Sequence, residues 1–548
     1  MVSNYTVDAA GGGGSREAPV FARASTGLVR ELGAWRAFIL TFGWVNLGSG
    51  AATFFAFALF MYPGTLPWIP LTIGMLLGLI YGWVYVLLGH AMPRTGGDYV
   101  WTSRIVHPAL GFGVSLLWMF LSVFLLAYQM SITTTVGIST SFGILGAILK
   151  DDGLKSLSST INTPTVTFII GTALLILFGL LNAFSVRWTF RVLAAILILG
   201  VVSFLIIVFL LLVTSHQQFV TNFDTLFGSG QYEGVLSKAR EHNFLVPITL
   251  GASITATPIA FLAYEGFNYS VNAGGEIRRP QRNLIISIIG AQLLGWIGLA
   301  LVSIVAINTV GYDFATGISS LFYNAPKDYP LFFPPWLNAL AGVAGYNLPG
   351  GTILVAIMLI GFSAILAIFG GILPFMVARN LFAAAFDRVL PTRLADVSPR
   401  YHTPLWAVVV VFVVAEIFLA VYEFTTFFTL LVNYVTGRAL GIGIVGFVAL
   451  VFPYIRRDLF ERSPQMVKAR IGGVPVISIC GGATLVIMAI QFVVLAQNPA
   501  LSGPTTPIAI GILPGLVVLG IVIYYISLWY HRREGVNISR AFGEIPPE

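Results

Sequence analysis

Four long, largely apolar segments most strongly limit what this chain can fold into. They cover residues 166–183, 189–213, 284–306 and 404–421. A helix needs about 20 largely apolar residues to cross the hydrocarbon core of a bilayer, and these segments are of that length. None of them alternates polar and apolar residues as the strand of a membrane barrel does. Because a spanning segment must satisfy its own backbone hydrogen bonds, the segments predict transmembrane helices.

The low charge content supports this assignment for the whole chain. Of 548 residues, 9% are charged and 57% are hydrophobic, whereas a soluble domain carries roughly 25% charged residues. The net charge of +7 is spread over short segments between the apolar runs, without the basic stripe of a nucleic-acid-binding surface. We therefore expect no nucleic-acid partner. The single cysteine, Cys480, excludes an intrachain disulfide and a Cys-His metal cluster, and we expect neither a metal nor a cofactor.

Twelve apolar segments are long enough to span a membrane, so the predicted fold class is an all-α integral membrane protein. The predicted spans are 38–62, 67–90, 98–136, 164–183, 188–214, 246–274, 283–308, 351–386, 404–422, 424–452, 474–496 and 507–530. We predict one membrane domain over 36–530. Three longer connections, 137–163, 215–245 and 309–350, are expected to carry short surface helices.

The basic residues are unevenly distributed between the two sets of connections, and this sets the predicted orientation. When the N-terminus is placed in the cytoplasm, most of the 29 Lys and Arg residues fall in inside segments, as expected for membrane proteins. We predict a multi-pass protein of the plasma membrane with a cytoplasmic, largely disordered tail at 1–35 and a second cytoplasmic tail at 531–548. No signal peptide is expected, because the N-terminus has no short apolar stretch followed by a cleavage site.

Two of the predicted spans contain residues that interrupt a helix. The first span contains the segment Asn46–Gly50, in which two glycines flank a serine. The sixth span contains Phe261–Phe267, which carries an acid and a glycine near its middle. Glycine lowers helix stability and lets a backbone approach a ligand. An ionisable residue at that depth indicates a functional site.

The two interruptions lie five helices apart, which places them at corresponding positions of two inverted halves. Such a pair indicates a substrate site near the membrane midplane. Free N–H groups at the start of a half-helix attract a carboxylate, and free carbonyls at the end of another attract a cation. An α-amino acid carries both groups close together. The alternative is that the glycines serve only close helix packing.

Four segments of the sequence resemble the amino acid–polyamine–organocation (APC) transporter superfamily. They are the Gly-Ser-Gly at 48–50, the loop at 96–112 that begins Gly-Gly-Asp-Tyr, the stretch from Phe261 to Asn283, and the end of the eighth span from Arg379 to Pro404. The resemblance implies a LeuT-type fold of two inverted five-helix repeats, at about 38–214 and 246–452, with helices 1 and 6 broken. Two additional helices, 474–496 and 507–530, complete it, and the implied mechanism is alternating access.

The resemblance also implies a substrate site. The backbone of the Gly-Ser-Gly segment would hold a carboxylate, and carbonyls at both breaks would face an amine. Ser122 lies where the family places a substrate-side residue, and Leu262 stands where many members have an aromatic gate. The predicted substrate-binding residues are Asn46, Gly48, Ser49, Gly50, Ser122, Phe261, Leu262, Tyr264, Glu265, Gly266 and Phe267.

The coupling ion is open between a proton, sodium and none. The middle of the eighth span, Ile368–Gly371, lacks the hydroxyls of a sodium site, and residues 188–214 contain no lysine. Glu265 is the candidate proton acceptor, because burial favours the protonated form of a carboxyl group. Glu265 could equally form a structural pair. Two further charges, Glu416 and Arg438, could pair if they lay together.

The surroundings of the predicted site favour neutral amino acids as substrates. A transporter of cationic amino acids or polyamines, or an exchanger, is the alternative, since Glu265 could hold a second ammonium group. An alternative of another class is a membrane nutrient sensor that binds without transporting. No enzymatic activity is expected, because the spans contain no nucleophile–base set and no metal-ligand set. The oligomeric state is open.

Overall fold

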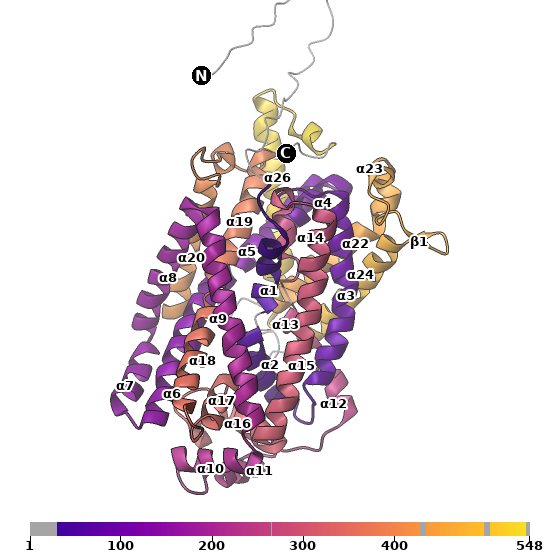
Figure 1. Ribbon diagram of the computed structural model, residues 1–548. Helices are drawn as coiled ribbons and strands as arrows, with labels where there is room; N and C mark the ends of the chain where they lie inside the picture. The colour runs from indigo at the N-terminus through magenta and orange to yellow at the C-terminus, as the bar shows by residue number, and fades with distance from the viewer. Residues whose placement is uncertain (1–29, 46, 265, 428–433, 498–504, 544–548) are drawn as a thin grey trace, which may run out of the picture.

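The computed structural model describes residues 30–45, 47–264, 266–427, 434–497 and 505–543. These residues form a bundle of long helices with a two-stranded hairpin at its side (Figure 1). In this part of the chain, ten helical segments are long and apolar enough to cross a membrane. They are Trp68–Ala91, Pro108–Leu149, Pro164–Phe184, Val186–Val213, Pro280–Val310, Gly351–Phe386, Leu405–Phe424, Tyr434–Ile455, Val476–Gln497 and Pro507–Arg533.

Most of these segments are single helices, and three are composite. The single helices are α3 (Trp68–Ala91), α8 (Pro164–Phe184), α9 (Val186–Val213), α20 (Leu405–Phe424), α22 (Tyr434–Ile455), α24 (Val476–Gln497) and α26 (Pro507–Arg533). The composite ones are α5 (Pro108–Ile132) with η1 (Thr133–Ser139) and α6 (Thr140–Leu149), α14 (Pro280–Ile285) with η4 (Ile286–Gly290) and α15 (Ala291–Val310), and α18 (Gly351–Leu366) with α19 (Phe369–Phe386). Each of the ten overlaps a span predicted from the sequence.

The third predicted span, 98–136, is wrong at both ends. Its first residues form a separate helix, α4 (Gly97–Ile105), because Pro108 starts α5 and the His107 side chain accepts a hydrogen bond from the Ala109 N–H. The helix then continues past 136 through the π-helical turn η1 into α6. Hydroxyls of the threonines at 133–135 bond to carbonyls four residues earlier, which satisfies these polar groups inside the helix.

The first and sixth predicted spans are not among the ten long segments. The first contains α1 (Ala34–Val45) and α2 (Leu47–Met61), which flank Asn46, a residue outside the described part. The sixth contains two short helices, α12 (Leu250–Thr255) and α13 (Thr257–Tyr264). After Glu265, also outside the described part, the chain continues as a turn and the 3-10 helices η2 (Tyr269–Asn272) and η3 (Gly274–Glu276). The predicted disordered tail lies mostly outside the described residues.

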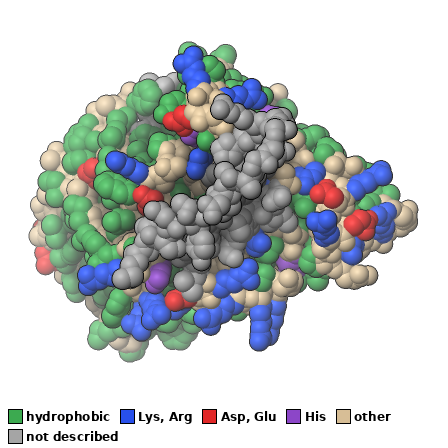
Figure 2. Space-filling view, turned by 90° about the horizontal axis from the view of Figure 1, so that it is seen from above, with side chains coloured by type: hydrophobic (Ala, Val, Ile, Leu, Met, Phe, Trp, Pro, Cys, Tyr) green, Lys and Arg blue, Asp and Glu red, His purple; other side chains and the backbone are tan. Residues whose placement is uncertain are grey.

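The three longer connections carry short helices, as predicted. They are α7 (Asp152–Ile161), α10 (His216–Phe227), α11 (Gln231–Glu241), α16 (Tyr312–Asn324), η5 (Pro326–Asp328) and α17 (Leu337–Ala344). The opposite end of the bundle carries η6 (Thr392–Ala395), α23 (Arg457–Arg462), β1 (Arg470–Ile471), β2 (Val474–Pro475) and η7 (Ile538–Phe542). That end lies at the top of Figure 1. We call it the basic end, because Lys and Arg side chains gather on it (Figure 2).

The packing is that of a membrane bundle, with apolar side chains also on the outside. On α9, for example, Leu205 and Leu212 are more than half exposed. Between helices, glycines allow close contact: a Cβ built on Gly481 of α24 would lie 2.7 Å from the Gly446 carbonyl oxygen of α22. Small residues at such interfaces let helix backbones approach where no hydrophobic effect drives them together.

Candidate functional site

The last turn of α1 packs directly on the turn that follows α13. Gly266 has φ +84°, and a Cβ built on it would lie 2.7 Å from Cδ1 of Trp44 and closer to Cγ and Cδ2. The Trp44 ring meets Tyr269 at 4.9 Å and Phe369 at 5.0 Å between centroids, both edge-on. Only glycine fits at 266, because this backbone conformation disfavours side chains and the indole occupies the space. The two predicted interruptions therefore lie side by side.

Several predicted site residues lie at this junction. Gly48, Ser49 and Gly50 are helical residues at the start of α2. A Cβ on Gly50 would lie 2.6 Å from the Val45 carbonyl oxygen, so the backbone is tightly packed there. Asn46 and Glu265 lie outside the described residues, so the predicted coupling role of Glu265 stays a prediction.

The aromatic residues of the sixth span face α3. Phe261 and Phe267 are buried, and their rings lie 5.9 and 4.7 Å from that of Tyr81. The Tyr264 hydroxyl donates to the Leu71 carbonyl at 3.0 Å, which directs this side chain away from the α1–α2 junction. Ser122 is buried on α5. Phe261 and Phe267 thus form one aromatic cluster with α3, while Tyr264 acts as an anchor to it.

The sequence analysis assigned no role at the site to Arg438, which reaches the same junction from α22. Its side chain is fully buried, with Nη1 donating to the Tyr269 hydroxyl at 3.0 Å and Nη2 to Asn268 Oδ1 at 3.4 Å. The guanidinium lies 4.3 Å from the ring centroid of Trp118 and 5.3 Å from that of Trp44. It does not pair with Glu416, whose carboxylate accepts from the Thr172 hydroxyl at 2.6 Å. A charged residue within a span was the signal in the sequence, but its partners, Asn268 and several aromatic residues, could not be read from spacing.

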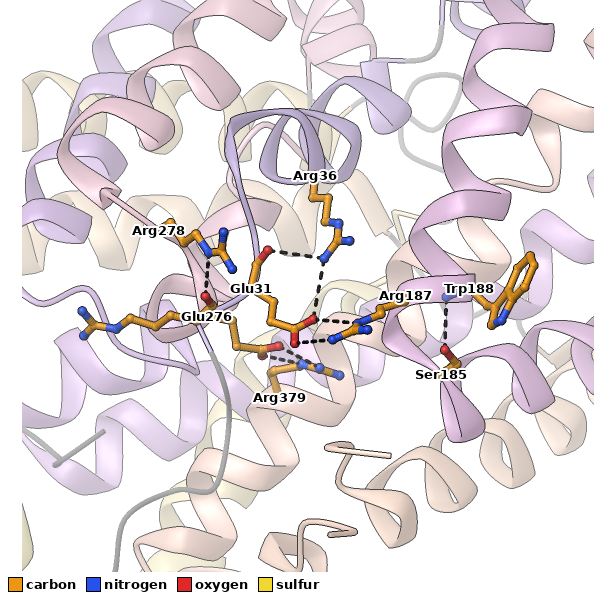
Figure 3. Close-up of polar contacts among 9 residues, drawn as sticks. Glu31, Arg36, Ser185, Arg187, Trp188, Glu276, Arg278 and Arg379 are labelled. Atoms are coloured by element: carbon orange, nitrogen blue, oxygen red, sulfur yellow. Dashed lines mark hydrogen bonds and ion pairs between the residues drawn. The ribbon is translucent and has the colours of Figure 1, made fainter. Parts of the chain in front are cut away.

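A buried ion pair fixes the exit of the sixth span at the basic end. Arg379 of α19 donates to both carboxylate oxygens of Glu276, at 2.8 and 3.1 Å (Figure 3). Its guanidinium also lies 3.6 Å from the Phe375 ring centroid. Such bidentate geometry offsets part of the cost of burying two charges. Both residues belong to the segments that resemble the APC superfamily.

Residues 31 and 32, just before α1, contact the exit of the sixth span and α9. The Leu32 N–H donates to the Glu276 carbonyl at 2.9 Å, and the Arg278 N–H donates to the Leu32 carbonyl at 2.8 Å. Glu31 receives two hydrogen bonds from Arg187 of α9, at 3.2 and 3.4 Å (Figure 3). The Arg187 guanidinium beside Glu31 holds the pKa of that carboxyl below its usual range. The start of α1, the exit of the sixth span and α9 are thus fastened together.

A second buried ion pair lies at the basic end. Arg104 of α4 contacts the Asp387 carboxylate at 2.7 Å, and the Tyr99 hydroxyl donates to the same carboxylate at 2.8 Å. The ring of Phe542, near the C-terminus, lies 4.8 Å from the Arg104 guanidinium. Arg104 and Asp387 each lie in a segment that resembles the APC superfamily, at 96–112 and 379–404, but their pairing was not predicted. Arg104 and Asp387 are 283 residues apart, so spacing could not reveal them.

These features agree with the comparison with known families. The family model described as amino acid permease matches residues 32–519. The chain belongs to this family, which lies within the APC superfamily, as the sequence resemblance indicated. It is a multi-pass membrane protein of a transporter family. No curated protein matches the chain significantly.

Proposed function

We propose that this permease carries neutral amino acids by alternating access, with the substrate at the junction of α1, α2 and α13. The observation that carries the proposal is the packing of Trp44 on Gly266 within a chain of the amino acid permease family. It brings the two spans with predicted interruptions together at one place. The substrate class, the alternating-access mechanism and the binding residues are proposed from the sequence and from the geometry of the junction.

The proposed recognition uses backbone groups. In this proposal, N–H groups at the start of α2, near Gly48 and Gly50, face the substrate and attract its carboxylate. Carbonyls in the last turn of α13, which ends at Tyr264, are proposed to attract the ammonium group of the substrate. Ser122 and the aromatic residues at 261 and 267 contribute to the walls.

The fixed positive charge of Arg438 favours a neutral substrate over a cationic one. Its guanidinium is held against Asn268 and Tyr269, directly after the end of α13. A second ammonium group near this charge would be repelled in a medium of low dielectric constant. Polyamines and cationic amino acids are therefore disfavoured.

In the proposed cycle, the basic end is cytoplasmic, and the charge pairs between its elements hold it closed. The Glu276–Arg379 pair, the Arg104–Asp387 pair and the Glu31–Arg187 contact fasten it. Opening toward the cytoplasm requires some of these contacts to separate. The basic face in Figure 2 supports cytoplasmic termini, since Lys and Arg accumulate on that side. We also propose one transporter domain over 36–530, with repeats at about 38–214 and 246–452, in the plasma membrane.

Counterflow in proteoliposomes tests the proposal. Vesicles are loaded with unlabelled L-leucine, L-alanine, L-phenylalanine, L-lysine or putrescine, and entry of the same labelled compound is measured. We expect saturable entry of a neutral amino acid and none of lysine or putrescine. Saturable binding without entry would favour the nutrient sensor. Gly48→Leu should abolish entry. Gly511→Leu is the matched control, because a Cβ at this α26 position meets nothing within 4 Å.

A further inference from the structure

Three carboxylates are buried at the basic end, and one of them differs from the others. Glu276 and Asp387 each have an arginine partner within 2.8 Å. Asp98, with 3% of its surface exposed, has no arginine in hydrogen-bond contact in the described part of the chain; the Tyr85 hydroxyl donates to its Oδ2 at 3.3 Å, and Asn268 lies beside it. Oδ1 of Asp98 has no hydrogen-bond partner among the described residues. An ionised carboxylate is costly in such a place, and the protonated form is favoured.

The groups that face Asp98 come from three elements. Tyr85 lies on α3, Asn268 lies in the turn after α13, and Arg438 lies on α22. Arg438 acts on Asp98 through its charge, while its own hydrogen bonds go to Asn268 and Tyr269. The ionisation of Asp98 is therefore affected by the same guanidinium that contacts the proposed substrate junction.

The backbone around Asp98 is attached to the exit of the sixth span. The Gly96 N–H donates to the Asn272 carbonyl at 2.9 Å, and Thr95 forms an antiparallel bridge with Ala273. A Cβ on Gly97 would lie 2.9 Å from Cγ2 of Val271. Movement of residues 268–273 must therefore change the surroundings of Asp98.

Burial raises the pKa of the Asp98 carboxyl to about 7, even though the Tyr85 hydrogen bond and the charge of Arg438 lower it. Asp98 lies in α4, between the spans Trp68–Ala91 and Pro108–Leu149. Its place in the first turn of α4 also favours the ionised form. Access of water would remove the effect of burial and return the carboxyl toward its ordinary range.

We propose that Asp98 is the proton-binding residue that couples amino acid transport to a proton gradient. The inference rests on the proposed function and assigns the coupling role to Asp98 in place of Glu265. The carboxyl holds its proton while the basic end is closed. When residues 268–273 move and water enters, the proton leaves the Asp98 oxygen for water, and the carboxylate remains. Closure requires a proton to be bound again.

The test compares two fluxes in proteoliposomes, using whichever of L-leucine, L-alanine and L-phenylalanine the wild type exchanges fastest. Counterflow needs no net proton movement, whereas accumulation driven by acid on the cytoplasmic or the opposite side does. Asp98→Asn mimics the protonated acid and should retain counterflow, while its gradient-driven accumulation falls at least tenfold. Asp98→Glu should restore part of the gradient-driven accumulation. Asp396→Asn, an exposed acid of the basic end, should leave both fluxes unchanged.

A second variant should shift the pH dependence of uptake without abolishing uptake. Tyr85→Phe removes the hydrogen bond that stabilises ionised Asp98. It should move the midpoint of the pH dependence of uptake upward, by roughly half to one unit. A midpoint unchanged in Tyr85→Phe would contradict the assignment.

The outcomes separate the inference from the proposed function. Wild-type counterflow without any response to a pH gradient overturns the inference and leaves the transporter intact. The same holds if Asp98→Asn keeps its accumulation, or if it loses both fluxes together, which would assign Asp98 a structural role. Absence of counterflow in the wild type overturns the proposed function itself.

Discussion

Replacement of Gly266 by alanine tests whether the α1–α13 junction is as tightly packed as the structure shows. The alanine Cβ would lie 2.7 Å or less from three atoms of the Trp44 ring, whereas carbon atoms in contact are about 3.5–4.0 Å apart. The indole must therefore move by about 1 Å or more. It is 8% exposed and hemmed in by Tyr269 and Phe369, so movement displaces these rings as well.

The expected cost has two parts, and a matched control separates them. A side chain at positive φ costs about 1 kcal/mol, and overpacking a filled site adds about 1–3 kcal/mol. Gly473 of the hairpin has φ +83°, and a Cβ there meets nothing within 4 Å. Gly473→Ala therefore carries the backbone cost alone.

The assay is the apparent melting temperature in detergent, measured together with counterflow. We expect Gly266→Ala to melt clearly below Gly473→Ala and to lose most of its counterflow, while Gly473→Ala transports normally. Equal melting temperatures and equal transport in the two variants would refute the reasoning, because the indole contact would then carry no constraint.

Three further predictions follow from the buried charges and the proposed site. Glu276→Gln leaves Arg379 without its ionised partner and should destabilise the protein by about 3–5 kcal/mol, seen as a lower melting temperature; no change would contradict the importance of this pair. Between pH about 4, the ordinary pKa of an aspartate, and pH about 7, Asp98 binds a proton in the folded protein but not in the unfolded chain. The stability of the wild type therefore falls as the pH rises through this window. Asp98→Asn removes this loss, worth ~4 kcal/mol, so its melting temperature should exceed that of the wild type at pH 8 but not at pH 4; a constant difference would argue against the raised pKa. Ser122→Trp should block counterflow, and normal counterflow would remove Ser122 from the site.

The long spans could be predicted because their apolar length alone determines them. The span 351–386 was predicted with the bounds that α18 and α19 have together. The third span was misplaced because apolar content does not reveal a helix start. The break at His107–Pro108 involves a side-chain cap, and past 136 the helix continues through a polar stretch whose threonine hydroxyls bond to its own carbonyls.

Close packing at two glycines of the candidate site could be predicted from the sequence, whereas the side-chain partners around them could not. Glycines at 50 and 266 signalled close approach, and the structure places both in tight contacts. The partners of Arg438 and of Asp387 come from segments more than 160 residues away. Which side chains meet over such distances depends on helix rotation, which a single sequence does not specify. Asp98 was recognised as part of a family motif, but only its burial distinguishes it from a solvated loop acid.

The central claim is that an amino acid binds at the backbone of the Gly-Ser-Gly segment in a transport cycle. Thiol protection tests it most directly, because Cys480 is the only native cysteine. A Ser49→Cys, Cys480→Ser protein in proteoliposomes is labelled with a maleimide, with and without the amino acid that shows counterflow. We predict that the substrate slows labelling at 49, with half-protection at the concentration that half-saturates counterflow. Labelling of an accessible thiol at 49 at the same rate with saturating substrate would contradict the account.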